Sequence, residues 1–212
     1  MRLLDVLRLR QRPITDAAGF CRFMAEQAAF TAQKFAYGYV RKRAGRSAEA
    51  LVTEDPFIAV MDVCRYDGTA VLLGDLLVLA EHHLRSHAPP ADPRLHAALC
   101  AVHREALQGI GLPAHRQDWG DVLAAFPARL AEAQAAPPQP LATVTRPGWQ
   151  ALYDRLPVPE AMRRNDHAIL DASFRLWVTT FHDTLVGRVD AAAVAGALLR
   201  GGTADPPLAR TG

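Results

Sequence analysis

The chain has 212 residues, of which 50% are apolar and 22% charged, and its formal net charge is +2. These values are typical of a folded globular protein and exclude a wholly disordered chain. Cys21, Cys64 and Cys100 are too few and too far apart for a disulfide scaffold, and no secretory signal pattern opens the chain. We therefore expect a protein of the reducing cytoplasm.

Residues 1–12 are predicted to form a basic amphipathic segment, in which Leu3, Leu4 and Leu7 share one face. The segment is far shorter than the roughly 20 residues that span a bilayer. It can dock on the protein's own core, or contact an acidic protein or the anionic inner face of a membrane. Because residues 1–46 hold ten Lys or Arg against three acidic residues, we expect the segment to face a partner. The predicted partner surface is formed by Arg2, Arg8, Arg10 and Arg12.

The best-marked helix begins after Thr15 or Asp16, which can cap it, and runs to about Arg43, with Gly45 as its stop signal. Its length would reach across a small domain, so we expect it to be central. Aromatic residues recur along one stripe at three- and four-residue steps, but polar residues interrupt that stripe.

A short helix is expected over 47–55 and another from Pro56 to about Tyr66, where Asp67-Gly68 reads as a break. The strongly apolar stretch from Thr69 to His87 predicts a buried core helix. Asp75 lies inside it, and an unpaired buried carboxylate is costly, so a partner such as Arg65 is expected. One hypothesis is a small ligand pocket between helices; the alternative is that Asp75 specifies packing and Lys34 reaches solvent. The candidate binding residues are Gln27, Lys34, Tyr37, Arg65 and Asp75.

Further helices are predicted from Asp92 to Gly109, and from Asp118 to Ala136 with a bend at Pro127. Residues 137–147 form the longest predicted loop and a candidate subdomain boundary. The remaining helices are expected over 149–156, from Pro159 or Asn165 to about 187, and over 190–201, followed by a flexible tail over 201–212. No stretch has the alternating pattern of a strand. The sequence thus predicts an all-α protein with one domain over 13–200, built from seven to nine helices.

Histidines gather in one part of the sequence: His82, His83, His87, His96 and His103 fall on two successive predicted helices. Side chains four residues apart on a helix point to the same side, an arrangement that zinc can use. No zinc-binding signature accompanies them, so we expect solvated or capping histidines and no metal. The alternative metal ligands are His83, His87, His96 and Cys100.

Signs of nucleophilic catalysis are scarce. Ser47 lies in Gly-Arg-Ser-Ala-Glu, which lacks the second glycine of a nucleophile elbow, and Ser86 and Ser173 have no flanking glycines. Cys100 lies among apolar residues typical of a core. His167, Asp171 and Arg175 stand at four-residue steps and are expected to form a surface ladder, whereas His182 is expected in the core. Phosphate loops, zinc fingers and a basic recognition helix are also missing, so neither a cofactor nor nucleic acid is expected.

The stretch from Phe30 to Tyr37, which follows an arginine-rich start, resembles uncharacterised helical bacterial proteins, some of which carry an esterase label. The resemblance implies an all-helical chain and a small hydrolase as an alternative function, without indicating any catalytic residue. From the residues themselves we predict a non-catalytic interaction or assembly protein with a protein partner.

Overall fold

The computed structural model describes residues 12–45, 53–88 and 92–201, and over these ranges the chain is all-α, as predicted. An isolated parallel bridge between Ile14 and Val189 is the one extended pairing in these ranges. The nine α-helices found there are α2 (Ala17–Ala44), α4 (Asp55–Leu84), α5 (Pro93–Ile110), α6 (Gly120–Ala135), α7 (Leu141–Val144), α8 (Arg146–Arg155), α9 (Glu160–Asn165), α10 (His167–Arg188) and α11 (Ala191–Gly201).

Several helix ends form through the side chains that the sequence indicates. The Asp16 carboxylate accepts a hydrogen bond from the Gly19 amide, and Asp92 accepts one from the Arg94 amide. These bonds satisfy amides that have no partner inside the helix. α5 ends at Ile110, one residue after the predicted end, and is capped by Gly111, whose φ of 83° is a conformation that favours glycine.

The predicted break at Asp67-Gly68 is wrong, because α4 runs unbroken through both residues. The Asp67 carboxylate is bound by side chains from other segments, so it does not compete for the helix backbone. Gly68 is required by packing, since a Cβ there would collide with the Leu152 side chain of α8. Tertiary contacts therefore override a local turn signal.

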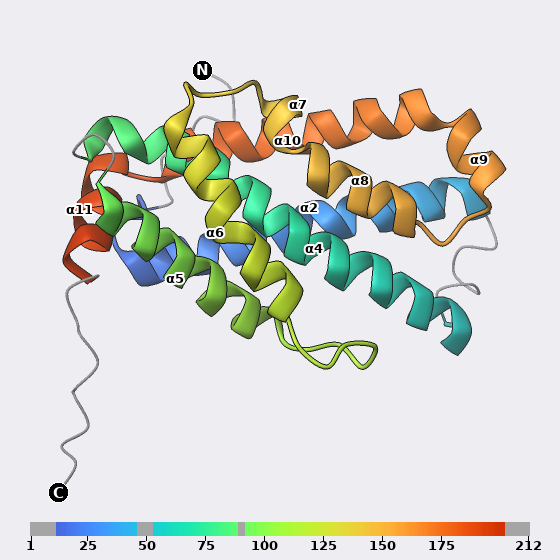
Figure 1. Cartoon of the computed structure of the whole chain (residues 1–212). Coiled ribbons are helices and arrows are strands. Elements are labelled where there is room, and N and C mark those ends of the chain that lie inside the picture. Colours follow the sequence, from blue (N-terminus) through green and yellow to red (C-terminus); the bar gives the residue numbers. More distant parts are fainter. Residues whose placement is uncertain (1–11, 46–52, 89–91, 202–212) are drawn as a thin grey trace, which may run out of the picture.

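α4 passes through the middle of the molecule, with α5 and α6 on one side and α8 and α10 on the other (Figure 1). Its residues 72–80 are all buried, which makes this helix the centre of the hydrophobic core. α2 packs lengthwise against α4 and adds Phe20, Phe23 and Phe35 to that core. The predicted long helix is thus central, but it shares this role with α4.

The predicted loop over 137–147 is partly helical, because α7 lies within it and α8 begins at Arg146.

The segment before α2 is hydrogen-bonded to the segment between α10 and α11. The Ile14 amide donates to the Arg188 carbonyl (2.8 Å), and the Asp190 amide donates to the Ile14 carbonyl (3.0 Å).

Several predictions lie outside the described residues. These are the amphipathic segment with Arg2, Arg8 and Arg10, most of the short helix over 47–55, and the tail. Arg12, the one member of the predicted partner surface that is described, is exposed. Across the described ranges, each helix is too short or too polar to cross a lipid bilayer.

Candidate functional site

Two buried carboxylates, Asp67 and Asp75, lie about two turns apart on α4 where α8 packs against it. Asp67 pairs with residues of α8 and of the connection before α6. Asp75 pairs with residues of α6 and α8. A pocket opens near Arg129, the partner of Asp75. The two carboxylates, their partners and this pocket form the candidate site.

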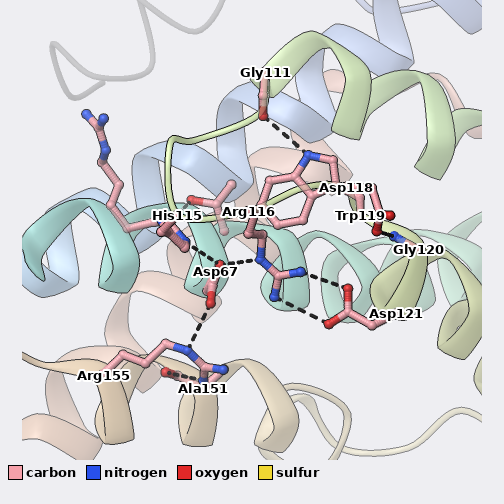
Figure 2. A network of polar contacts seen from close by, with 12 residues as sticks. Asp67, Gly111, His115, Arg116, Asp118, Trp119, Gly120, Asp121, Ala151 and Arg155 are labelled. Carbon is pink, nitrogen blue, oxygen red and sulfur yellow. Dashed lines mark hydrogen bonds and ion pairs between the residues drawn. The ribbon is translucent and has the colours of Figure 1, made fainter. Parts of the chain in front are cut away.

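Asp67 is surrounded by three basic side chains, as Figure 2 shows. Its Oδ1 lies 2.7 Å from Nε of Arg116 and 3.0 Å from Nε2 of His115, and its Oδ2 lies 3.3 Å from Nε of Arg155. Arg116 also binds the Asp121 carboxylate through both terminal nitrogens, at 2.8 and 3.3 Å. The network thus extends from α8 across α4 to the first turn of α6.

Aromatic packing fixes the position of Arg116. Its guanidinium lies 4.7 Å from the centre of the Trp119 ring, and the Trp119 indole N–H donates to the Gly111 carbonyl at 3.3 Å. A cation over an indole face is an attractive contact. The connection from α5 to α6 is therefore held at both of its ends.

The side chains around Asp67 determine whether its carboxyl group is ionised. Burial raises the pKa of this carboxyl group, but hydrogen bonds from Arg116 and His115 lower it by more, so the net pKa lies below the ordinary value. Asp67 is therefore ionised at neutral pH, and the network is a set of matched charges.

Asp75 has fewer partners and no solvent exposure. Its Oδ2 accepts a hydrogen bond from the Gly148 amide at 2.7 Å, and its Oδ1 forms an ion pair with Arg129. Burial raises the pKa of Asp75 to about 7, because it outweighs the opposing effects of Arg129 and Gly148. Arg129 also donates to the Val144 carbonyl at 2.6 Å, which secures the segment before α8.

A pocket of about 210 Å³ lies between α4, α5 and α6, and its lining includes members of both networks but neither Asp67 nor Asp75. Gly74, His103 and Phe126 form part of its apolar wall, and Asp121 and Arg129 supply charged groups. The His103 ring stacks on Phe126 with 4.2 Å between ring centres, and its Nε2 is buried without a hydrogen-bond partner. Burial lowers the pKa of His103 to about 4, so the imidazole is neutral at physiological pH.

The predicted pairing of Arg65 with Asp75 is wrong. Arg65 lies ten residues away on the same helix, a rise of about 15 Å, and it pairs instead with Asp62 at 3.0 Å. Lys34 is exposed with its ammonium 5.4 Å from the Phe30 ring, while Gln27 and Tyr37 are half-buried on α2. Arg65 does line a second pocket of about 290 Å³ between α2, α4 and α5, with Glu26 and Gln33. That pocket includes neither Asp75 nor the other predicted residues.

The histidines are not assembled into a metal site in the described ranges, where no three His, Cys, Asp or Glu side chains come together in a suitable group. Nδ1 of His96 lies 2.9 Å from the Gln134 side chain, and His103 stacks on Phe126. Of these two histidines, only His96 is a candidate metal ligand. The other candidates, His83, His87 and Cys100, do not join it in a group of three possible ligands among the described residues.

The groups considered for catalysis are scattered. Burial raises the pKa of Cys21 to about 11 and that of Cys64 to about 12, and it also raises the pKa of Cys100, so all three thiols are protonated at neutral pH. The Ser86 hydroxyl donates to the His83 carbonyl at 3.4 Å. Asp171 and Arg175 form the expected ion pair at 2.8 Å, but His167 instead contacts the rings of Trp149 and Tyr153.

No family model, curated protein or solved structure matches this chain. The site therefore rests on its own geometry, and the resemblance to esterase-labelled proteins stays a prediction. The sequence indicates Asp67, in the Arg65-Tyr66-Asp67 cluster, and Asp75 as members of a buried polar network, but it does not indicate their partners His115, Arg116, Arg129 and Arg155. No local spacing indicates that these side chains meet, because they come from four separate segments.

Proposed function

We propose that the protein is a non-catalytic helical interaction protein that binds a protein partner through an apolar surface on α10. The observation that carries the proposal is a group of large apolar side chains left open to solvent on this helix and on the adjoining part of α2. We define the α10 surface by Phe30, Ile169, Leu176 and Trp177.

Three side chains of the α10 surface are well exposed, and the fourth, Trp177, is half-buried. Ile169 is 55% exposed, Leu176 62% and Phe30 44%, and Phe30 packs edge-on against Trp177. Ile169 and Leu176 are seven residues apart, which places them on the same side of a helix. α10 buries its opposite side, through residues such as Phe174 and Phe181, against the core. Exposed contiguous apolar surface is typical of protein-binding sites.

The absence of catalysis is inferred from the groups that are present. The cysteine thiols are held protonated, and the carboxylates of the candidate site are engaged by arginines. Such pairs hold helices together and leave no activated nucleophile among them. We also propose that the protein acts in the cytoplasm and that the basic segment over residues 1–12 contacts the partner or an anionic membrane surface.

Site-specific photo-cross-linking in the native cell tests the binding surface. A photoreactive amino acid at position 176 is expected to capture one defined partner, which Leu176→Glu should then weaken at least tenfold in a purified binding assay. Leu112 provides a matched control, since it is a similarly exposed leucine in a different segment. Equal capture from position 112, or unchanged binding by Leu176→Glu, would show that the α10 surface is not the binding surface.

Hydrolysis of short acyl esters tests the absence of catalysis. We expect the purified protein to give no turnover above the uncatalysed rate. Turnover that disappears on substitution of Ser47, Ser86, Ser173 or Cys100 would establish the hydrolase alternative instead.

A further inference from the structure

We propose that the pocket between α2, α4 and α5 binds a free α-amino acid with an apolar side chain. The pocket has a volume of about 290 Å³, and its lining combines one acidic side chain, Glu26, one basic side chain, Arg65, and a mostly apolar surface. An apolar amino acid has matching parts in its ammonium group, its carboxylate and its side chain. The inference goes beyond the proposed function, because it assigns a small molecule to the side of α2 that faces α4 and α5.

Glu26 is an accessible carboxylate without a cation. It is exposed, it lines the pocket from α2, and its carboxylate makes no hydrogen bond or ion pair with another described residue, not even with Arg22 one turn earlier. An ammonium group that bonds to a carboxylate forms a charge-assisted hydrogen bond, roughly twice as strong as a neutral one. Glu26 is therefore a ready acceptor for a ligand ammonium.

Arg65 supplies the opposite charge from α4. Its Nη2 lies 3.0 Å from the Asp62 carboxylate, and its guanidinium lies 4.5 Å from the centre of the Tyr66 ring. The other guanidinium nitrogens have no hydrogen-bond partner among the described residues, and 31% of the side chain is exposed. A guanidinium has five N–H donors, so Arg65 can keep Asp62 and still bind a ligand carboxylate.

The two charges line one pocket from different helices, and no ion pair joins Glu26 to Arg65. A ligand with a single charge would be attracted by one of these side chains and repelled by the other. A zwitterion offers each of them a partner at the same time. The charge pattern therefore favours an amino acid over a simple amine or a simple carboxylic acid.

The apolar part of the lining leaves room for the ligand's side chain. Ala25 and Ala29 on α2 and Ile110 at the end of α5 contribute to it. The volume of about 290 Å³ exceeds the roughly 150 Å³ of a cavity that holds benzene. A small set of polar groups on a mostly apolar wall is typical of small-molecule sites. A branched aliphatic side chain fits this space.

L-Leucine and two truncated forms of it are suitable probes. 4-Methylpentanoate lacks the ammonium group of leucine, and 3-methylbutylamine lacks the carboxylate. We expect L-leucine to bind the full-length protein saturably with a Kd of about 0.1–1 mM, the range for a ligand of this size. Each truncated probe should bind about tenfold more weakly. Titrations are followed by calorimetry and by shifts in the ¹H–¹⁵N NMR spectrum, which should centre on α2, α4 and α5 around the pocket.

Two charge variants identify which group binds which end of the ligand. Glu26→Gln should weaken L-leucine binding about tenfold but not weaken 4-methylpentanoate, which has no ammonium group to lose. Arg65→Gln should weaken L-leucine by a similar factor but not weaken 3-methylbutylamine. Glu132→Gln and Arg104→Gln are matched controls, because both side chains are exposed and neither lines the pocket. Both controls should bind L-leucine within twofold of the wild type.

A third variant tests the apolar wall. Ala29→Leu fills the pocket from α2 and is expected to abolish L-leucine binding. Ala18→Leu adds the same side chain at an exposed position of the same helix outside the pocket, and it should leave binding unchanged.

The proposal is overturned if L-leucine does not bind saturably, or if either truncated probe binds as tightly as L-leucine. It is also overturned if Glu26→Gln or Arg65→Gln weakens L-leucine no more than its control does, or if Ala29→Leu and Ala18→Leu bind it equally well. The spectrum of each variant without ligand establishes that it is folded. Should Ala29→Leu fail to fold, the two charge variants of exposed side chains still decide the outcome.

Discussion

Asp67 and Asp75 lie on the same buried helix, but their environments shift their pKa values in opposite directions. Asp67 is contacted by His115, Arg116 and Arg155, and the hydrogen bonds from Arg116 and His115 hold its pKa below the ordinary value. Asp75 has one arginine and one backbone amide, and complete burial raises its pKa to about 7. Burial penalises charge at both sites, and the number of partners decides whether the penalty is overcome.

The largest effect is expected for Arg129→Met. This change leaves the Asp75 carboxylate buried without its countercharge, so at pH 8 it should lower the free energy of unfolding by about 3–5 kcal/mol. Urea denaturation measures the loss. Near pH 5 the deficit should shrink, because Asp75 is then protonated in the folded protein. A deficit of the same size at both pH values would mean that the Arg129 contact acts by packing alone.

Asp75→Asn is expected to change the pH dependence of stability by about 2–4 kcal/mol. The pKa of Asp75 is about 7 when folded and about 3.9 when unfolded, so between these values the folded state holds the extra proton. The free energy of unfolding therefore falls as pH rises from about 4 to about 7, and is constant above that. Urea denaturation across this range should show Asp75→Asn gaining on the wild type as pH rises.

Asp67→Asn is the matched variant and should behave in the opposite sense. Because the folded pKa of Asp67 is lowered, its stabilising contribution is present above the unfolded pKa and is lost as pH falls through the folded pKa. The variant should therefore be least stable relative to the wild type at pH 7 and should approach it as pH falls through the folded pKa of Asp67. Parallel curves for the two asparagine variants would contradict the contrast between the sites.

Gly148→Ala tests how closely α8 must approach Asp75. A Cβ at this position would lie 2.6 Å from the Asp75 carboxylate and 3.1 Å from the α4 backbone at Leu72. We expect a loss of about 1–3 kcal/mol, typical of overpacking. Gly38→Ala is the control, since a Cβ there meets nothing within 4 Å on α2, and it should be neutral or stabilise by up to about 1 kcal/mol. Thermal unfolding of both variants gives the comparison, and equal changes in Tm would refute it.

The smallest effect is expected for Arg116→Met. Asp67 keeps His115 and Arg155 as partners, so the loss should be about 1–2 kcal/mol, clearly below that of Arg129→Met. Denaturation of the two methionine variants side by side at pH 8 measures this difference. If Arg116→Met costs as much as Arg129→Met, then the extra partners do not protect Asp67.

The sequence predicted the helical class, the caps at Asp16 and Asp92, and the burial of Asp75, because each depends on nearby residues. It could not predict the partner of Asp75, since Arg129 reaches it from a helix that begins 45 positions later in the chain. The Asp67-Gly68 signal failed for the same reason. Asp67 contacts Arg116 and Arg155, and Gly68 leaves room for Leu152. Packing between distant segments places these residues against α4, and no local spacing in the sequence indicates it.

The bridge between Ile14 and Val189 has a consequence for folding kinetics. It closes a loop that contains nearly the whole described chain, and closing so long a loop costs more entropy than forming the local contacts of a helix. We therefore expect the two ends to meet after the core around α4 has assembled. On this expectation the bridge forms after the transition state for folding. A substitution that weakens its hydrogen bonds should then speed unfolding while leaving the rate of folding almost unchanged.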